Sequence, residues 1–253
     1  MKSTNRLSLV CICIAVLTAV QCKNSDSNEK SEEKEQFKIS GKIKNQPDGM
    51  IYLEELDVPE GASSLVDSVQ LQNDQFTFSG KVDFPKWYAI KTSDTTEWPL
   101  RIVLSNEDIT INAVKDSLYK AKVNGASVYA EYQDYYDTYF EKIRSKARPI
   151  YQLLDSLNQG GKRELVKDER LMMDKKWEEM SRFSDSITKL YVSNNPGSLA
   201  APMIISERYI QYADPDRADE LYQLLDPKAQ SSFYGKKLSK ALEGYKSVAV
   251  GSR

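Results

Sequence analysis

The sequence contains no histidine and only three cysteines among its 253 residues. Histidine is the side chain whose ordinary pKa lies closest to neutrality. Its absence excludes Ser-His-Asp and Cys-His nucleophiles and every metal site built on imidazole. The cysteines are Cys11, Cys13 and Cys22, all near the amino terminus. If the chain is cleaved before Cys22, only that cysteine survives, which leaves no intramolecular disulfide and no Cys-x-x-Cys couple.

An excess of charge of one sign is also lacking, because 35 basic residues face 37 acidic ones, a net charge of −2. Nucleic-acid binding needs a clustered basic surface, so we predict no nucleic-acid partner. The sequence shows no Walker loop, G-x-G-x-x-G, G-x-S-x-G or EF-hand loop in a credible context. We therefore predict a protein that is not an enzyme, with no catalytic residues, no cofactor and no metal.

Carboxylates are plentiful, and they leave one catalytic alternative open. Glu55 and Asp57 would share one face of a strand, while Glu54 would point away. A pair of carboxylates is the machinery of glycan hydrolysis, so a carboxylate-based hydrolase is the alternative. We favour a solvated strand end.

What is present begins with an export signal. Lys2 and Arg6 precede an apolar run from Leu7 to Val20. The run is too short to cross a hydrocarbon core of ~30 Å comfortably, and it fits the apolar region of a signal peptide. We therefore predict a signal peptide over residues 1–21.

The residues before Cys22 resemble a bacterial lipobox, with Ala19 three positions upstream, although Gln21 stands where a small residue is usual. We predict that Cys22 is the lipid-anchored first residue of the mature protein. The protein would lie on the periplasmic or surface side of a bacterial membrane, and we favour the outer membrane. A plain signal peptide cleaved nearby, or an uncleaved anchor, is the alternative.

Residues 22–36 are predicted to be the anchor and a polar tether, because Lys23 to Gln36 include no apolar residue. Such a segment cannot offset its ordering entropy by burial. Its acidic residues could instead form a surface-export signal of the kind found in Bacteroidetes-type lipoproteins; we favour the spacer.

Alternation of apolar and polar residues from Phe37 onward indicates about eight short strands over residues 37–124. Ile51 and Leu53 would begin the strand that returns from the first one. Asn73-Asp74 marks a hairpin, and Leu118 to Val123 is a further strand candidate. The fold class predicted is α+β, with an antiparallel β-sandwich-like domain followed by an all-α region.

A period of 3.6 residues replaces the alternation near Ser127, and we predict helices over residues 125–245. Pro149 should kink or break the first, long helix. A second helix would carry the stripe from Met173 to Tyr191. Capping residues Ser198, Asp214 and Asp226 would start three shorter helices, and Gly244 would close the last one. Residues 246–253 would be the remnant of a linker.

Possible ligand contacts are Trp98, Tyr132 and Tyr136. Five tyrosines crowd the segment from Tyr129 to Tyr139, at a spacing that favours a helix face packed on the sheet. A stacking platform for sugar or peptide is the alternative. Trp98, in a loop before a proline, is the better contact candidate, although a buried loop plug is the interpretation we favour.

Several motifs taken in order resemble a known family. They are Phe37 to Ile43, Met50 to Leu53, Val66 to Val69 and Gln75 to Val82, then Asn124-Gly125 and Asn195 to Ser198. Together they resemble the β domain of unknown function near the amino terminus of Bacteroidetes-type lipoproteins of the thioredoxin-like group, which includes peroxiredoxin and disulfide-reductase types.

In that family a thioredoxin-like domain usually follows the helices. Val248 to Ser252 resembles its entry, and the sequence given stops at Arg253, so no position corresponds to the family's thiol pair. We expect an envelope-anchored accessory binding or scaffold protein, with the membrane and an envelope protein or peptide as partners. The alternative is a truncated fragment of a thiol-disulfide oxidoreductase.

Overall fold

The computed structural model describes residues 34–56, 63–94 and 96–251. The predicted signal peptide, Cys22 and most of the predicted tether lie outside these residues, as does Asp57. Within the described ranges, no helix is both long enough and apolar enough to span a bilayer.

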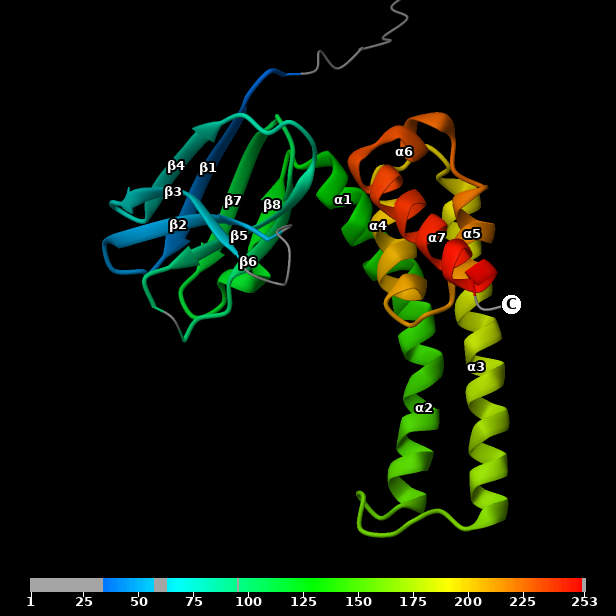
Figure 1. Cartoon of the computed structure of the whole chain (residues 1–253). Helices are drawn as coiled ribbons and strands as arrows, with labels where there is room; N and C mark the ends of the chain where they lie inside the picture. Colours follow the sequence, from blue (N-terminus) through cyan, green and yellow to red (C-terminus); the bar gives the residue numbers. More distant parts are fainter. Residues whose placement is uncertain (1–33, 57–62, 95, 252–253) are drawn as a thin grey trace, which may run out of the picture. The chain divides into compact units, whose positions relative to one another are not determined.

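Two four-stranded sheets make up the first part of the described chain (Figure 1). Their inward side chains contribute to one apolar core. The fold class predicted from the sequence, α+β, is therefore confirmed. One sheet has the order β4-β1-β7-β8, formed by Gln75–Gly80, Phe37–Lys44, Asp108–Val114 and Lys122–Asn124. The other has the order β3-β2-β5-β6, formed by Ser64–Leu71, Gly49–Glu55, Lys86–Thr92 and Leu100–Leu104.

Strand pairing differs from the expectation in two respects. β1 pairs antiparallel with β4 but parallel with β7, so the first sheet is mixed. The expectation that Ile51 and Leu53 return alongside β1 was wrong, since β2 belongs to the other sheet. After β1 the chain turns at Asn45, whose φ is 64°, and crosses to that sheet. Alternation reveals a half-buried strand but not which of two facing sheets receives it.

The predicted turn at Asn73-Asp74 is confirmed, with φ of 51° and 64°. Gln72 and Gln75 exchange two backbone hydrogen bonds of 3.0 and 2.9 Å across it. β3 and β4 then diverge into opposite sheets, so no regular hairpin ladder follows. The expected strand from Leu118 to Val123 is shorter than predicted. Its first part is a 3₁₀ turn, η2 (Leu118–Lys120), because the buried Leu118 fills the core there.

A continuous helical run follows, made of α1 (Ser127–Asp134), the π-helical segment η3 (Tyr135–Phe140) and α2 (Glu141–Leu157). Of the expected kink or break at Pro149, the break was wrong, because α2 continues through it. Pro149 lies on the exposed face of α2, as does Ser145 one turn earlier. Water can therefore satisfy the Ser145 carbonyl that loses its amide partner.

The second long helix is α3 (Lys167–Asn194), which packs beside α2 (Figure 1). The predicted stripe is confirmed at its buried positions, Met173, Met180, Ser184 and Tyr191. α3 ends at Asn194, immediately before Asn195 and Pro196.

Shorter elements complete the chain: α4 (Ala201–Ile205), the π-helical η4 (Ser206–Ile210), α5 (Pro215–Tyr222), α6 (Pro227–Ser231) and α7 (Phe233–Gly251). The predicted caps are confirmed for α5 and α6. Asp214 accepts from the Arg217 amide and Asp226 from the Ala229 amide, at 3.2 and 3.1 Å. The expectation that Ser198 caps a helix was wrong, because α4 has Ala200 as its N-cap residue. The Ser198 hydroxyl still accepts from the Ala201 amide at 3.2 Å.

The expected helix end at Gly244 was wrong, since α7 extends to Gly251. A helical glycine costs only about 1 kcal/mol relative to alanine, which is not enough to stop a helix held by its neighbours. Beyond Gly244, the Tyr245 hydroxyl donates to the Ile210 carbonyl at 3.4 Å.

Gly125 joins the last strand to α1 through a close approach of two backbones. Its φ is +85°, and a Cβ placed there would lie 2.0 Å from the carbonyl oxygen of Asp108. Two residues later, the Ser127 amide donates to the Glu107 carboxylate at 3.0 Å. The start of α1 is therefore fixed against the start of β7.

We expect Gly125→Ala to lower the free energy of unfolding by about 2 to 4 kcal/mol, because it combines backbone strain with a clash. Gly161→Ala is the matched control, since Gly161 has a φ of +82° and no atom within 4 Å of the added Cβ. It should cost only about 1 kcal/mol, the strain alone. Urea denaturation of both variants measures the difference, and equal losses would contradict the close-approach argument.

Candidate functional site

The tyrosine-rich segment divides into two faces. Tyr135, which is completely buried, packs edge-on to Tyr191 at 5.0 Å between ring centroids, and its hydroxyl lies 3.0 Å from that of Thr188. Tyr132 and Tyr136 are only half-buried and turn the other way. The wider turn of η3 allows two consecutive tyrosines to point in different directions, Tyr135 into the core and Tyr136 to an open surface.

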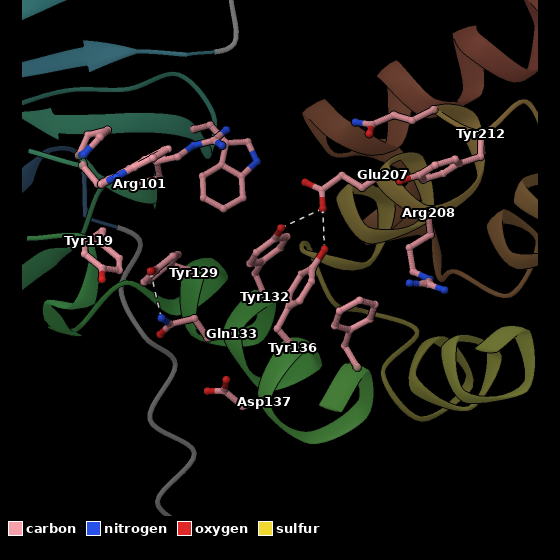
Figure 2. Close-up of a pocket in the computed structure, with 15 residues that line it drawn as sticks. Arg101, Tyr119, Tyr129, Tyr132, Gln133, Tyr136, Asp137, Glu207, Arg208 and Tyr212 are labelled. Carbon is pink, nitrogen blue, oxygen red and sulfur yellow. Dashed lines mark hydrogen bonds between the residues drawn. The ribbon is translucent and has the colours of Figure 1, made fainter. Parts of the chain in front are cut away.

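That surface is a cleft of about 1170 Å³ (Figure 2). Its wall on the sheet side comes from β5, β6, η2 and the loop before β6, and its helical wall comes from α1, η3, η4 and the residues after η4. Eight of its fifteen lining residues are aromatic. The lining consists of Trp87, Trp98, Pro99, Arg101, Tyr119, Tyr129, Tyr132, Gln133, Tyr136, Asp137, Phe140, Glu207, Arg208, Gln211 and Tyr212.

One carboxylate oxygen organises the helical wall. Oε2 of Glu207 accepts hydrogen bonds from the hydroxyls of Tyr132 and Tyr136, at 2.8 and 2.9 Å (Figure 2). Burial, followed by the charge of Glu207, raises the pKa of Tyr132 far above its ordinary value of 10.0. Burial likewise raises the pKa of Tyr136. Both phenols therefore keep their protons at neutral pH and act as donors to Glu207.

Trp87 of β5 connects the sheet to this wall. Its ring meets Tyr132 edge-on at 4.8 Å and Tyr129 at 6.4 Å between centroids. The guanidinium of Arg101, on neighbouring β6, lies 5.6 Å from the centroid of the Trp87 ring. A cation over an aromatic face is held electrostatically, so Trp87 positions both a tyrosine and an arginine.

Arg208 is the second arginine of the cleft. Its guanidinium lies 5.3 Å from the centroid of the Phe140 ring and donates to the Ser184 hydroxyl. Its Nε is buried and has no hydrogen-bond partner among the described residues. Glu207 and Arg208, although consecutive, extend in different directions (Figure 2).

All three ligand contacts named from the sequence line this one cleft: Trp98, Tyr132 and Tyr136. The preferred interpretation of Trp98 as a buried loop plug was wrong, because 75% of its surface is exposed. Tyr132 does pack against the sheet, through Trp87, as the helical spacing of the tyrosines suggested. The same residue thus serves the packing and lines the cleft.

Sequence reasoning missed Arg101, Glu207 and Arg208. Arg101 is one outward residue of a short strand, which gives it no local signal. Glu207 and Arg208 do stand out in one respect, since they follow a run of apolar residues from Leu199 to Ile205 broken only by a proline. Two charged residues next to so apolar a segment indicate that they make specific polar contacts, but the sequence does not show with which residues.

Of the carboxylates named as a hydrolase alternative, Glu54 and Glu55 do not line the cleft. Glu55 forms an ion pair of 2.8 Å with Lys86 on the adjacent strand, and Glu54 pairs with Lys91. Burial alone would raise the pKa of Glu54, but the hydrogen bond to Lys91 and the charge of that lysine help to bring it below its ordinary value. Asp57 lies outside the described residues. In the described part of the chain, no group of three or more potential metal-ligating side chains occurs.

Comparison with known proteins identifies the sheet part of this arrangement. Residues 37–132 match a family model described as a domain of unknown function (DUF4369). The matched region extends from β1 into α1. It includes Trp87, Trp98 and Arg101, and it ends at Tyr132, while Tyr136, Glu207 and Arg208 lie beyond the DUF4369 region. No curated protein matches the chain.

We expect Glu207→Ala to lower the free energy of unfolding by about 2 kcal/mol, because two half-buried hydroxyls lose their acceptor. In a Tyr132→Phe/Tyr136→Phe background, the same substitution should cost much less, since no donors are left unsatisfied. A double-mutant cycle by urea denaturation measures this coupling. The shared-acceptor account fails if the loss is the same in both backgrounds.

Proposed function

We propose that this protein is a non-catalytic, envelope-anchored lipoprotein whose folded part is a binding module, and that its ligand binds in the aromatic cleft. The observation that supports this most strongly is the convergence of Trp98, Tyr132 and Tyr136 in one cleft of about 1170 Å³. Concave, largely aromatic surfaces with a few fixed polar groups are the usual form of ligand sites.

The polar groups of the cleft support binding rather than catalysis. The chain has no histidine, and Glu207 already accepts two hydrogen bonds from tyrosines that keep their protons. With both hydrogen bonds formed, the Glu207 carboxylate has a structural role, because it fixes the tyrosines of the helical wall. The aromatic rings then offer a preorganised surface that loses little entropy when a ligand binds.

The lipoprotein part of the proposal rests on the sequence, with Cys22 as the attachment point after the apolar run. The resemblance to thioredoxin-like lipoproteins supports an accessory role beside such redox proteins. The membrane would be reached through the lipid, and an envelope protein or peptide would be the partner. We propose no cofactor.

Lipid attachment predicts that a radiolabelled fatty acid fed to expressing cells is incorporated into the wild-type protein and not into Cys22→Ala. Cell fractionation should then find the wild type with membranes and the variant in the soluble fraction. Because Cys11 lies within the predicted signal peptide, Cys11→Ala is the matched control and should be labelled like the wild type. Undiminished labelling of Cys22→Ala would contradict the proposal.

Binding in the cleft can be followed by intrinsic fluorescence, because two of the three tryptophans, Trp87 and Trp98, line it. In a Trp177→Phe background the emission reports on those two. We expect size-fractionated peptides and glycans from envelope extracts to shift this emission saturably. Trp98→Ala should raise the half-saturating concentration by about tenfold or more, as expected for a tryptophan that contacts the ligand.

The control for this experiment is Tyr151→Ala, which removes an exposed aromatic ring that packs on Trp177 outside the cleft. It should bind as the background protein does. Saturable binding that Trp98→Ala leaves unchanged would place the ligand elsewhere and refute the assignment of the cleft.

A further inference from the structure

Arginines without an acidic partner are few in the described part of the chain, and two of them line the cleft. Five of the described arginines form ion pairs with carboxylates: Arg144, Arg148, Arg163, Arg182 and Arg217. Arg101, Arg170 and Arg208 form none among the described residues, and Arg101 and Arg208 are the two in the cleft. Both arginines that line the cleft thus carry a positive charge without an acidic partner among the described residues.

Arg101 is the better placed of the two to meet a ligand. It is exposed, and its strand neighbours Leu100 and Ile102 are buried at 1% and 0% exposure, which fixes the backbone beneath it. Its guanidinium rests over Trp87 and makes no hydrogen bond to the described residues. With its guanidinium 5.6 Å from the Trp87 ring centroid, Arg101 keeps a planar fork of donors that matches the geometry of a carboxylate.

Neither acidic residue of the cleft forms an ion pair with this arginine. Arg101 and Glu207 both border a smaller adjoining cavity of about 210 Å³, and they do not form an ion pair. Asp137 and Glu207 also line the main cleft. A singly charged carboxylate can reach Arg101 there, whereas a dianionic phosphate would be repelled more strongly by the two acids.

The composition of the lining indicates the class of partner. Eight aromatic residues and two arginines are present, and no lysine is, although lysine is common in this chain. Enrichment in tryptophan, tyrosine and arginine with depletion of lysine is the signature of protein-recognition surfaces. The exposed rings of Trp98 and Tyr212 then provide broad apolar contact for side chains.

We propose that the cleft binds a peptide segment of a partner protein through a carboxylate of that segment, which Arg101 receives as a bidentate ion pair. An apolar or aromatic side chain of the same segment packs against Trp98. This inference rests on the proposed binding function and adds the class of ligand and the residue that selects it. The carboxylate belongs either to a chain terminus or to an acidic side chain.

Three pools of synthetic N-acetylated pentapeptides test the inference. The first ends in a free carboxylate and lacks acidic residues, the second is carboxy-amidated and contains one Asp or Glu, and the third is amidated and has no acid. Each is titrated into the full-length Trp177→Phe protein, and the emission of Trp87 and Trp98 is followed. We expect the first or the second pool to bind, which identifies the source of the carboxylate, and the third to bind at least tenfold more weakly.

Substitution of the arginine completes the test. Arg101→Gln should weaken binding of the favoured pool by about tenfold or more, and Arg101→Lys should restore only part of it, because lysine keeps the charge but not the fork. Arg170→Gln is the matched control, since Arg170 is also exposed and without an acidic partner but lies on α3 outside the cleft. Circular dichroism checks that each variant is folded.

Each remaining outcome overturns the inference in a distinguishable way. Equal binding of the acid-free pool, or binding that Arg101→Gln leaves unchanged, removes the carboxylate contact. Binding of neutral or acidic oligosaccharides in a manner that depends on Trp98, with no peptide pool bound, replaces peptide with glycan and leaves the proposed binding function standing. If no probe binds in a manner that depends on Trp98, both the inference and the proposed function fail.

Discussion

The shared oxygen of Glu207 is the constraint on which the cleft depends. Its two donors, Tyr132 and Tyr136, are 75 and 71 positions away in the sequence, so the contact joins the first helical segment to η4. Half-buried hydroxyls and a half-buried carboxylate each carry a desolvation cost, which only their mutual hydrogen bonds offset. Because these groups satisfy one another, the rings of the wall are held in one orientation. Contacts with the proposed ligand would then come from groups that form no such hydrogen bonds.

Both partners in this contact involve π-helical segments. Tyr136 belongs to η3, and Glu207 and Arg208 belong to η4. A π turn adds a residue to the helix and rotates the side chains beyond it, which is why such turns recur at functional sites. In η3 the rotation places Tyr135 in the core beside Tyr191 and leaves Tyr136 at the cleft. The site is thus formed where two helices depart from regular geometry.

Local patterns in the sequence were sufficient for the elements and for part of the site. Alternation located β1, and side-chain caps located the starts of α5 and α6, because these signals depend on neighbouring residues alone. Sheet membership could not be read this way, since β2 shows the same alternation whichever sheet it joins. Trp98, Tyr132 and Tyr136 were found because aromatic residues in a loop or cluster are conspicuous. Arg101 was missed because what distinguishes it is the absence of an acidic partner among the described residues. That absence can be seen only in the folded chain.

The boundary of the DUF4369 region bears on how the two parts of the chain work. The region supplies Trp87, Trp98 and Arg101, and it ends at Tyr132, one of the two donors to Glu207. The acceptor and the second donor come from residues beyond it. A DUF4369 region alone would therefore retain the arginine and the exposed tryptophan, but it would lose the carboxylate that orients Tyr132 and the opposite wall of the cleft. The helices therefore complete the wall of the cleft, and they are as much a part of the proposed site as the sheet domain is.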